Sequence, residues 1–124
     1  MAFELLNKLW VGNDNSGEDY DFIASKGIHT LINMNSFGCI SVSTVKRVLT
    51  CESPLSSIVD ALILCNEENK PVLIYGSSPQ NYISIEVFNA LIQFLRTIFP
   101  SMSYDYLSKC LYSKIPKECW EPLR

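Results

Sequence analysis

Short apolar runs separated by polar turns predict the strands of this chain. Residues 3–11 alternate loosely between apolar and polar and end at the turn signal 12–15, so they predict one strand or a pair of short strands. β-Branched residues are frequent over 28–35, which predicts a second strand region, and 45–50 predicts another. Residues 72–75 are apolar throughout, as in a central parallel strand whose two faces are both covered.

Four segments carry apolar residues at the spacing of a helix. Helices are expected over 16–26, from 54 to the polar turn at 66–70, over 80–99, and from a start within 101–105 to about 113. The third has the broadest apolar face, formed by Ile83, Val87, Leu91, Phe94, Leu95 and Ile98.

Residues that favour helix ends stand at two of these boundaries. Ser16 or Gly17 is expected to cap the first helix, and Gly27 to end it. Ser53 is expected to cap the second helix, with Pro54 at its first position, where the missing N–H of proline costs nothing.

Strands and helices that alternate along the chain predict the α/β class. We expect a three-layer domain with a mostly parallel central sheet flanked by helices. Its β–α–β beginning favours a parallel pair of strands joined by a crossover helix. At 124 residues the chain fits a single domain, residues 1–124.

Charge and hydropathy narrow the classes of partner. A formal charge of −3 argues against general affinity for nucleic acid, and the basic pair Lys46-Arg47 is better explained as solvated surface than as a phosphate contact. No apolar run has the length of a membrane span, and the first residues lack the pattern of a secretory signal. We therefore expect a cytoplasmic or nuclear protein with no membrane partner.

The cysteines and the one histidine offer no metal site. Five cysteines are present without a CxxC pair or another zinc-binding spacing, so we expect reduced thiols, no metal and no cofactor. Cys65 stands in an apolar run and is interpreted as a small core residue. His29 begins an apolar run, where a hydrogen-bonded structural role is expected.

The strand, polar loop and helix of residues 71–84 form the frame on which phosphate-cradling loops are built. Such loops use the free N–H groups and the positive dipole of the helix N-terminus. Here the loop contains no cysteine, no arginine or lysine, and no glycine in its middle. The sequence thus predicts a phosphate-handling frame without the chemistry, and binding rather than turnover.

Several blocks resemble the dual-specificity protein phosphatases of the cysteine-dependent tyrosine phosphatase superfamily. LWVGN at 9–13 is similar to the opening strand of that family, and DFIASKGIHTLIN at 21–33 to its D-x-L-x-x-x-G-I-T-H-I segment. PVLIYG at 71–76 falls where the family has V-L-V-H-C, and WEPL at 120–123 resembles its aromatic-x-x-L ending. The resemblance implies the phosphatase fold. Rhodanese-like domains are the alternative fold, disfavoured by the first block and by the last helix.

The family signature H-C-x-x-G-x-x-R-S is replaced at each defining position. Aligned without gaps, the histidine becomes Tyr75, the nucleophilic cysteine Gly76, the middle glycine Pro79, the arginine Tyr82 and the serine Ile83. The chain thus resembles pseudophosphatases of the STYX type, which also carry glycine at the nucleophile position. It departs from them in lacking the arginine as well.

The general acid of the family is an aspartate on a loop after the third strand. Glu52 is the nearest candidate here, although a plain carboxylate at the helix start is the favoured interpretation.

We therefore predict a pseudophosphatase that binds proteins as a scaffold, competitor or regulatory subunit, the partner being a kinase, a phosphatase or a phosphatase substrate. The alternatives are a phospho-residue-binding module and an enzyme with non-cysteine chemistry. A polar turn without any ligand is the simplest interpretation of the loop itself. If it binds a partner, the predicted surface is Tyr75, Gly76, Ser77, Ser78, Pro79, Gln80, Asn81 and Tyr82.

Overall fold

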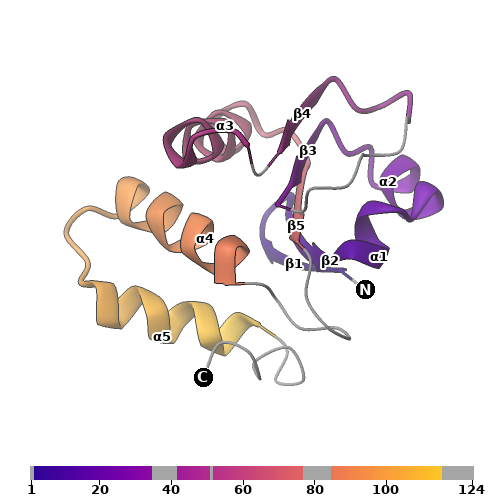
Figure 1. The fold of residues 1–124 in the computed structure, drawn as a ribbon. Helices are drawn as coiled ribbons and strands as arrows, with labels where there is room; N and C mark the ends of the chain where they lie inside the picture. The colour runs from indigo at the N-terminus through magenta and orange to yellow at the C-terminus, as the bar shows by residue number, and fades with distance from the viewer. Residues whose placement is uncertain (1, 35–41, 51, 77–84, 116–124) are drawn as a thin grey trace.

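A five-stranded sheet forms the centre of the computed structural model, which describes residues 2–34, 42–50, 52–76 and 85–115 (Figure 1). The strand order is β1-β2-β5-β3-β4. The strands are β1 Ala2–Leu6, β2 Leu9–Asn13, β3 Thr30–Asn33, β4 Arg47–Thr50 and β5 Val72–Gly76. The helices are α1 Asp14–Gly17, α2 Tyr20–Ser25, α3 Leu55–Glu68, α4 Ile85–Ile98 and α5 Tyr104–Lys114.

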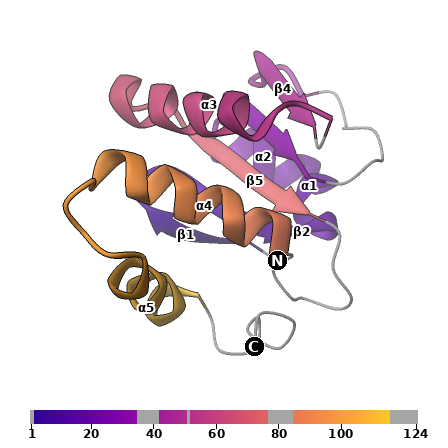
Figure 2. The same ribbon diagram turned by 60° about the vertical axis from the view of Figure 1, so that its left-hand side comes forward.

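Helices cover both faces of the sheet, which confirms the predicted three-layer α/β class. α1 and α2 lie on one face, α3 and α4 lie on the other, and α5 packs against α4 (Figure 2). Four neighbouring strands, β2, β5, β3 and β4, are parallel, and only β1 pairs antiparallel. No helix within the described residues combines the length and apolarity needed to cross a bilayer.

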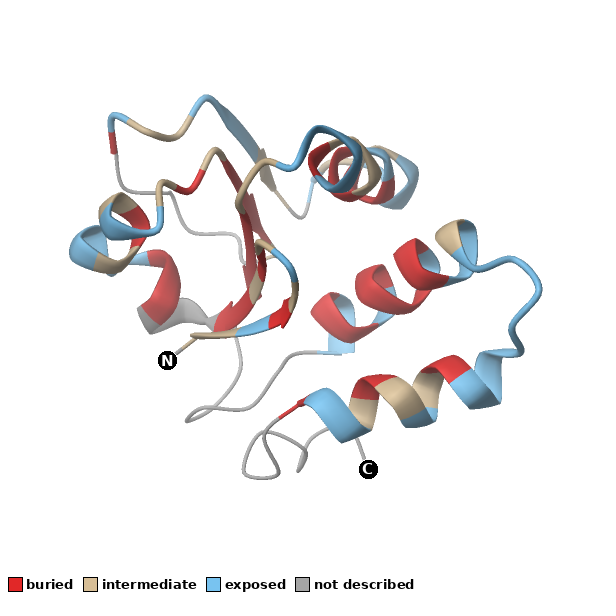
Figure 3. Ribbon diagram, turned by 180° about the vertical axis from the view of Figure 1, so that it is seen from behind, coloured by how far each residue is buried: buried red, intermediate tan, exposed pale blue. Residues whose placement is uncertain are grey.

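The central strand β5 supplies side chains to two separate cores, one on each face. Val72 and Ile74 belong to the larger core, which β5 shares with α3, α4 and α5. Leu73 and Tyr75 belong to the smaller core, which includes Ile23 of α2. Because successive side chains of a strand point to opposite faces, this apolar strand is buried on both sides, as its sequence predicted. The buried stripe of α4 facing the sheet is visible in Figure 3.

The first two strands form an antiparallel hairpin, which confirms the alternative of two short strands. The predicted turn at 12–15 is wrong, because the chain turns earlier, where Lys8 has a φ of 64°. The carboxylate of Glu4 accepts a hydrogen bond from the N–H of Lys8 and holds that turn. β2 therefore continues to Asn13, and α1 follows at once.

The single helix predicted over 16–26 is two helices, α1 and α2. The cap of α2 is Asp19, whose side chain accepts from the N–H of Phe22, so the assignment of a cap to Ser16 or Gly17 is wrong. Gly27 ends α2 with a φ of 62°, as predicted. β2 and β3 are parallel but do not pair with each other, because β5 lies between them.

The limits of α3 also differ from the prediction. Its cap position is Pro54 and carries no side-chain hydrogen bond, so Ser53 is not the cap. The N–H of Ser53 instead donates to the carbonyl of Thr50 in the turn after β4. α3 continues through most of the predicted polar turn to Glu68, and Asn69 ends it with a φ of 58°.

The last two helices agree with the prediction over the described residues. Val87, Leu91, Phe94 and Leu95 of α4 are buried, whereas Ile83 lies outside the described part of the chain. Ser103 caps α5 by accepting from the N–H of Tyr106, and α5 ends one residue beyond the predicted limit.

Candidate functional site

The carboxyl ends of the four parallel strands share one edge of the sheet, where ligands bind in open α/β folds. At this edge Asn13 of β2 pairs in register with Gly76 of β5, and Asn33 of β3 with Tyr75. β5 ends at Gly76 and α4 begins at Ile85, which confirms the strand and helix of the predicted frame. The connecting residues 77–84 lie outside the described residues, and with them Ser77, Ser78, Pro79, Gln80, Asn81 and Tyr82.

Tyr75 is directed into the protein, because only 3% of its surface is exposed. Its ring lies against Gly17 of α1, so closely that a Cβ atom at Gly17 would overlap it. Its carbonyl accepts a hydrogen bond of 2.7 Å from the N–H of Met34, beyond the end of β3. The prediction that Tyr75 contributes to an exposed binding surface does not agree with this burial. The ring instead fixes the end of β5 to α1 from inside.

Gly76 is the last residue of the central strand and is buried. The prediction from the motif alignment is that the family's nucleophile would stand at this position. A glycine offers no atom beyond its backbone, so residue 76 contributes no side-chain chemistry at this edge.

Glu52 lies in the turn between β4 and α3 and is exposed. Its backbone N–H donates to the hydroxyl of Thr50 over 3.3 Å. β3 lies between β4 and β5 in the sheet, so Glu52 follows a strand that is not adjacent to the one ending at Gly76. It precedes the cap residue Pro54, and the first turn of α3 carries no acidic residue. Glu52 is therefore not a residue of the first turn of α3 either.

Two buried polar residues near this edge were not predicted as site residues from the sequence. Ser16 of α1 is 3% exposed and Asn33 of β3 is 1% exposed. The available signal was that Asn33 ends an apolar strand, since polar residues at the carboxyl ends of parallel strands often line sites. At this edge of the sheet, β3 thus contributes the polar side chain of Asn33, and β5 contributes the buried ring of Tyr75.

His29 has the structural role that its position predicted, and it lies at the opposite edge of the sheet. Its Nδ1 is 2.8 Å from the hydroxyl of Thr30, which also accepts from the thiol of Cys65. Since the thiol donates, the hydroxyl proton of Thr30 is available to Nδ1 of a neutral imidazole. Burial, and then the positive charges of Lys70 and Arg47, lower the pKa of His29 below its ordinary value of 6.5.

This lowered pKa predicts a loss of stability at mildly acidic pH. Below pH 6.5 the unfolded chain binds the His29 proton before the folded chain does, so the free energy of unfolding should fall as pH decreases toward the folded pKa. Urea denaturation of the wild type and of His29→Asn from about pH 7.5 to about pH 5 measures this. The variant should lose less stability over this interval, and equal slopes would contradict the assignment.

The described cysteines do not form a metal or disulfide site. Cys65 is buried and Cys110 half-buried, and both are free thiols. The burial of Cys65 in the larger core confirms its assignment as a core residue. Among the residues that the structure describes, no group of three His, Cys, Asp or Glu side chains could hold a metal ion.

Comparison with known proteins identifies the fold. No protein-family model matches the sequence, and a search of curated proteins finds no significant relative. The structure is similar to the crystal structure of human DUSP28, with a TM-score of 0.73 and 12% identity over 93% of this chain and 81% of that one. It is also similar to human tyrosine phosphatase-like serine/threonine/tyrosine-interacting protein, with a TM-score of 0.72 and 16% identity over 95% of this chain and 85% of that one. A third similar structure is DUSP15, with a TM-score of 0.70 and 13% identity over 90% of this chain and 74% of that one. The chain therefore has the fold of dual-specificity phosphatases, as its motifs implied.

Proposed function

We propose that this chain is a catalytically inactive phosphatase-like protein that acts by binding other proteins, as a scaffold, competitor or regulatory subunit. The observation that carries the proposal is the residue at the end of β5. Gly76 ends the central strand of the sheet, and the ungapped alignment with the family signature puts the nucleophilic cysteine at this position. Without a thiolate there, no phosphocysteine intermediate can form.

Loss of phosphate-binding groups supports the same proposal. The position that aligns with the signature arginine is Tyr82, and no lysine or arginine occurs between Lys70 and Arg96. Each charge-assisted hydrogen bond to a phosphate is worth about 1.5–3 kcal/mol. Without a lysine or arginine in this segment, a phosphate dianion would lose its hydration and gain no such bond from it. Pro79 also removes one backbone N–H from the loop.

A partner that is itself part of phosphorylation signalling fits this fold best: a kinase, a phosphatase or a phosphatase substrate, in the cytoplasm or nucleus. One similar structure is named as a tyrosine phosphatase-like interacting protein, which favours binding over turnover by analogy. A partner would then bind to the surface of the folded domain, and no phosphate would be hydrolysed.

The alternative of a phospho-residue-binding module is tested with a matched pair of peptides, one with phosphotyrosine and one with tyrosine. Fluorescence anisotropy should show no preference of the purified chain for the phosphorylated peptide at low or high salt. Selective capture that weakens as salt is added would contradict the proposal, because it would require a phosphate site.

A further inference from the structure

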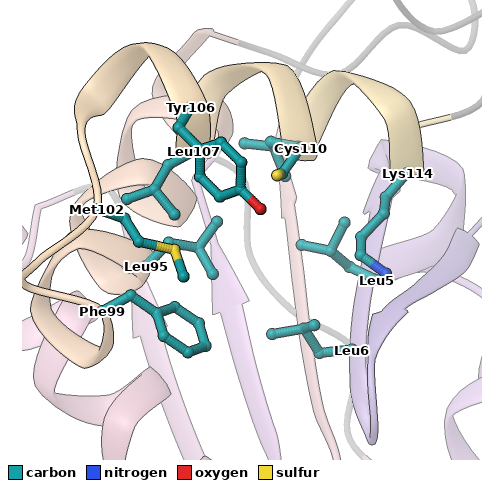
Figure 4. Close-up of a pocket in the computed structure, with 10 residues that line it drawn as sticks. Leu5, Leu6, Leu95, Phe99, Met102, Tyr106, Leu107, Cys110 and Lys114 are labelled. Atoms are coloured by element: carbon teal, nitrogen blue, oxygen red, sulfur yellow. The ribbon is translucent and has the colours of Figure 1, made fainter.

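An apolar cavity lies far from the carboxyl edge of the sheet, between β1, the end of α4 and α5 (Figure 4). Its volume is about 240 Å³. The walls are formed by the leucines of β1 and by large apolar side chains of the two helices and of the turn between them. They include Leu5, Leu6, Leu95, Phe99, Met102 and Leu107.

Several of these wall residues are unusually exposed for apolar side chains. Phe99 is 42% exposed, Met102 is 40% exposed and Tyr106 is 53% exposed, and all three line the cavity. Contiguous exposed apolar surface of this kind marks ligand or protein sites. The cavity can therefore be entered from solvent without unfolding α5.

One stripe of α5 supplies the polar groups of the cavity. Tyr106, Cys110 and Lys114 are spaced by four residues, so they share a face of the helix. Figure 4 shows the phenol oxygen of Tyr106 and the sulfur of Cys110 directed into the cavity, with the Lys114 amine at its margin beside Leu5. Hydrogen bonding to Cys110 raises the pKa of Tyr106 above its ordinary value of 10.0. A neutral phenol can donate a hydrogen bond.

Lys114 is the only charged residue among the described residues that line the cavity. The nearest acidic residue of β1, Glu4, already accepts a hydrogen bond from the backbone of Lys8. An apolar chamber with one cation and one hydroxyl at its margin matches a ligand with an apolar body and a single negative charge. The volume favours a small ligand, since pockets for drug-sized molecules are usually about 300–1,000 Å³.

We propose that this cavity binds a small amphiphilic carboxylate, such as a medium-chain fatty acid. The alkyl chain would pack between β1 and α5, and the carboxylate would pair with Lys114 and accept from the Tyr106 hydroxyl. The site is independent of the carboxyl edge, so it does not depend on the proposed loss of catalysis.

The test is calorimetric titration of the full chain with decanoate and, as the uncharged probe of equal chain length, decanol. Decanoate should bind saturably and about two- to fivefold more tightly than decanol, as a partly exposed ion pair provides. Lys114→Gln should abolish this difference. Lys109→Gln, an exposed lysine of the same helix that does not line the cavity, should leave both affinities unchanged.

Filling the cavity tests the position of the alkyl chain. Cys110→Phe should weaken both probes at least tenfold, and Met102→Trp, in the exposed turn before α5, provides a second filled variant if the first does not fold. The absence of saturable decanoate binding would overturn the proposal. So would equal effects of Lys114→Gln and Lys109→Gln on the affinities of the two probes.

Discussion

Replacement of Phe94 by alanine is expected to lower the free energy of unfolding by about 3–5 kcal/mol. Phe94 is 1% exposed and belongs to the larger core, in which α4 meets the sheet and its neighbouring helices. Removing the ring leaves a cavity that the surrounding helices cannot fill without moving, which adds to the lost burial. Urea denaturation followed by circular dichroism measures the change.

Phe99 provides the matched control for this prediction. It is the same residue type five residues later, directly after the end of α4, but it is 42% exposed. Phe99→Ala should cost about 1 kcal/mol or less, because little new cavity forms at a half-exposed side chain. Similar losses for the two variants would show that α4 is not packed as described.

Replacement of Gly17 by alanine is the second large effect. A methyl group there would overlap the ring of Tyr75, so either α1 or the end of β5 must move. We expect a loss of about 1–3 kcal/mol, the usual cost of overpacking. In a Tyr75→Val background the same change should cost at least about 1 kcal/mol less, since the overlapping ring is absent.

Gly27→Ala separates this steric effect from the general cost of replacing a glycine. Gly27 has open space around its Cα but a φ of 62°, so alanine should cost about 1–2 kcal/mol from backbone strain alone. That cost should be the same with Tyr75 or Val at residue 75. If the Gly17→Ala and Tyr75→Val effects were additive, the contact between α1 and β5 would be refuted.

The class of the fold and most elements could be predicted from periodicity, because burial imposes it directly. Residues 72–75 are apolar throughout because β5 is the central strand and both of its faces are covered. α4 and α5 follow their apolar stripes closely.

The predicted boundaries are wrong where local hydrogen bonds decide the backbone conformation and the pattern of apolar residues does not. The side chain of Asp19 caps a new helix, α2, and so divides the predicted first helix in two. Lys8 adopts a left-handed conformation that its residue type does not favour, held by Glu4, so the hairpin turn lies earlier than the polar run suggested.

The strand that leads to the candidate site could be predicted from the sequence, but the packing around its end could not. The predicted strand covered residues 72–75, and the structure extends it by one residue to Gly76. Alternation could not show that the ring of Tyr75 is covered by Gly17, because this contact joins segments far apart in the chain. The cavity beside α5 was missed for the same reason, since β1 forms one of its walls.

The rate of hydrolysis of an aryl phosphate by the purified chain tests the central claim most directly. We expect no turnover above the buffer rate, either for the wild type or for Gly76→Cys, because the single thiol would still lack the arginine that binds phosphate. Turnover by the wild type that survives replacement of all five cysteines would establish an enzyme with other chemistry. Appreciable hydrolysis by Gly76→Cys alone would show that the loop still binds phosphate, and would contradict the account.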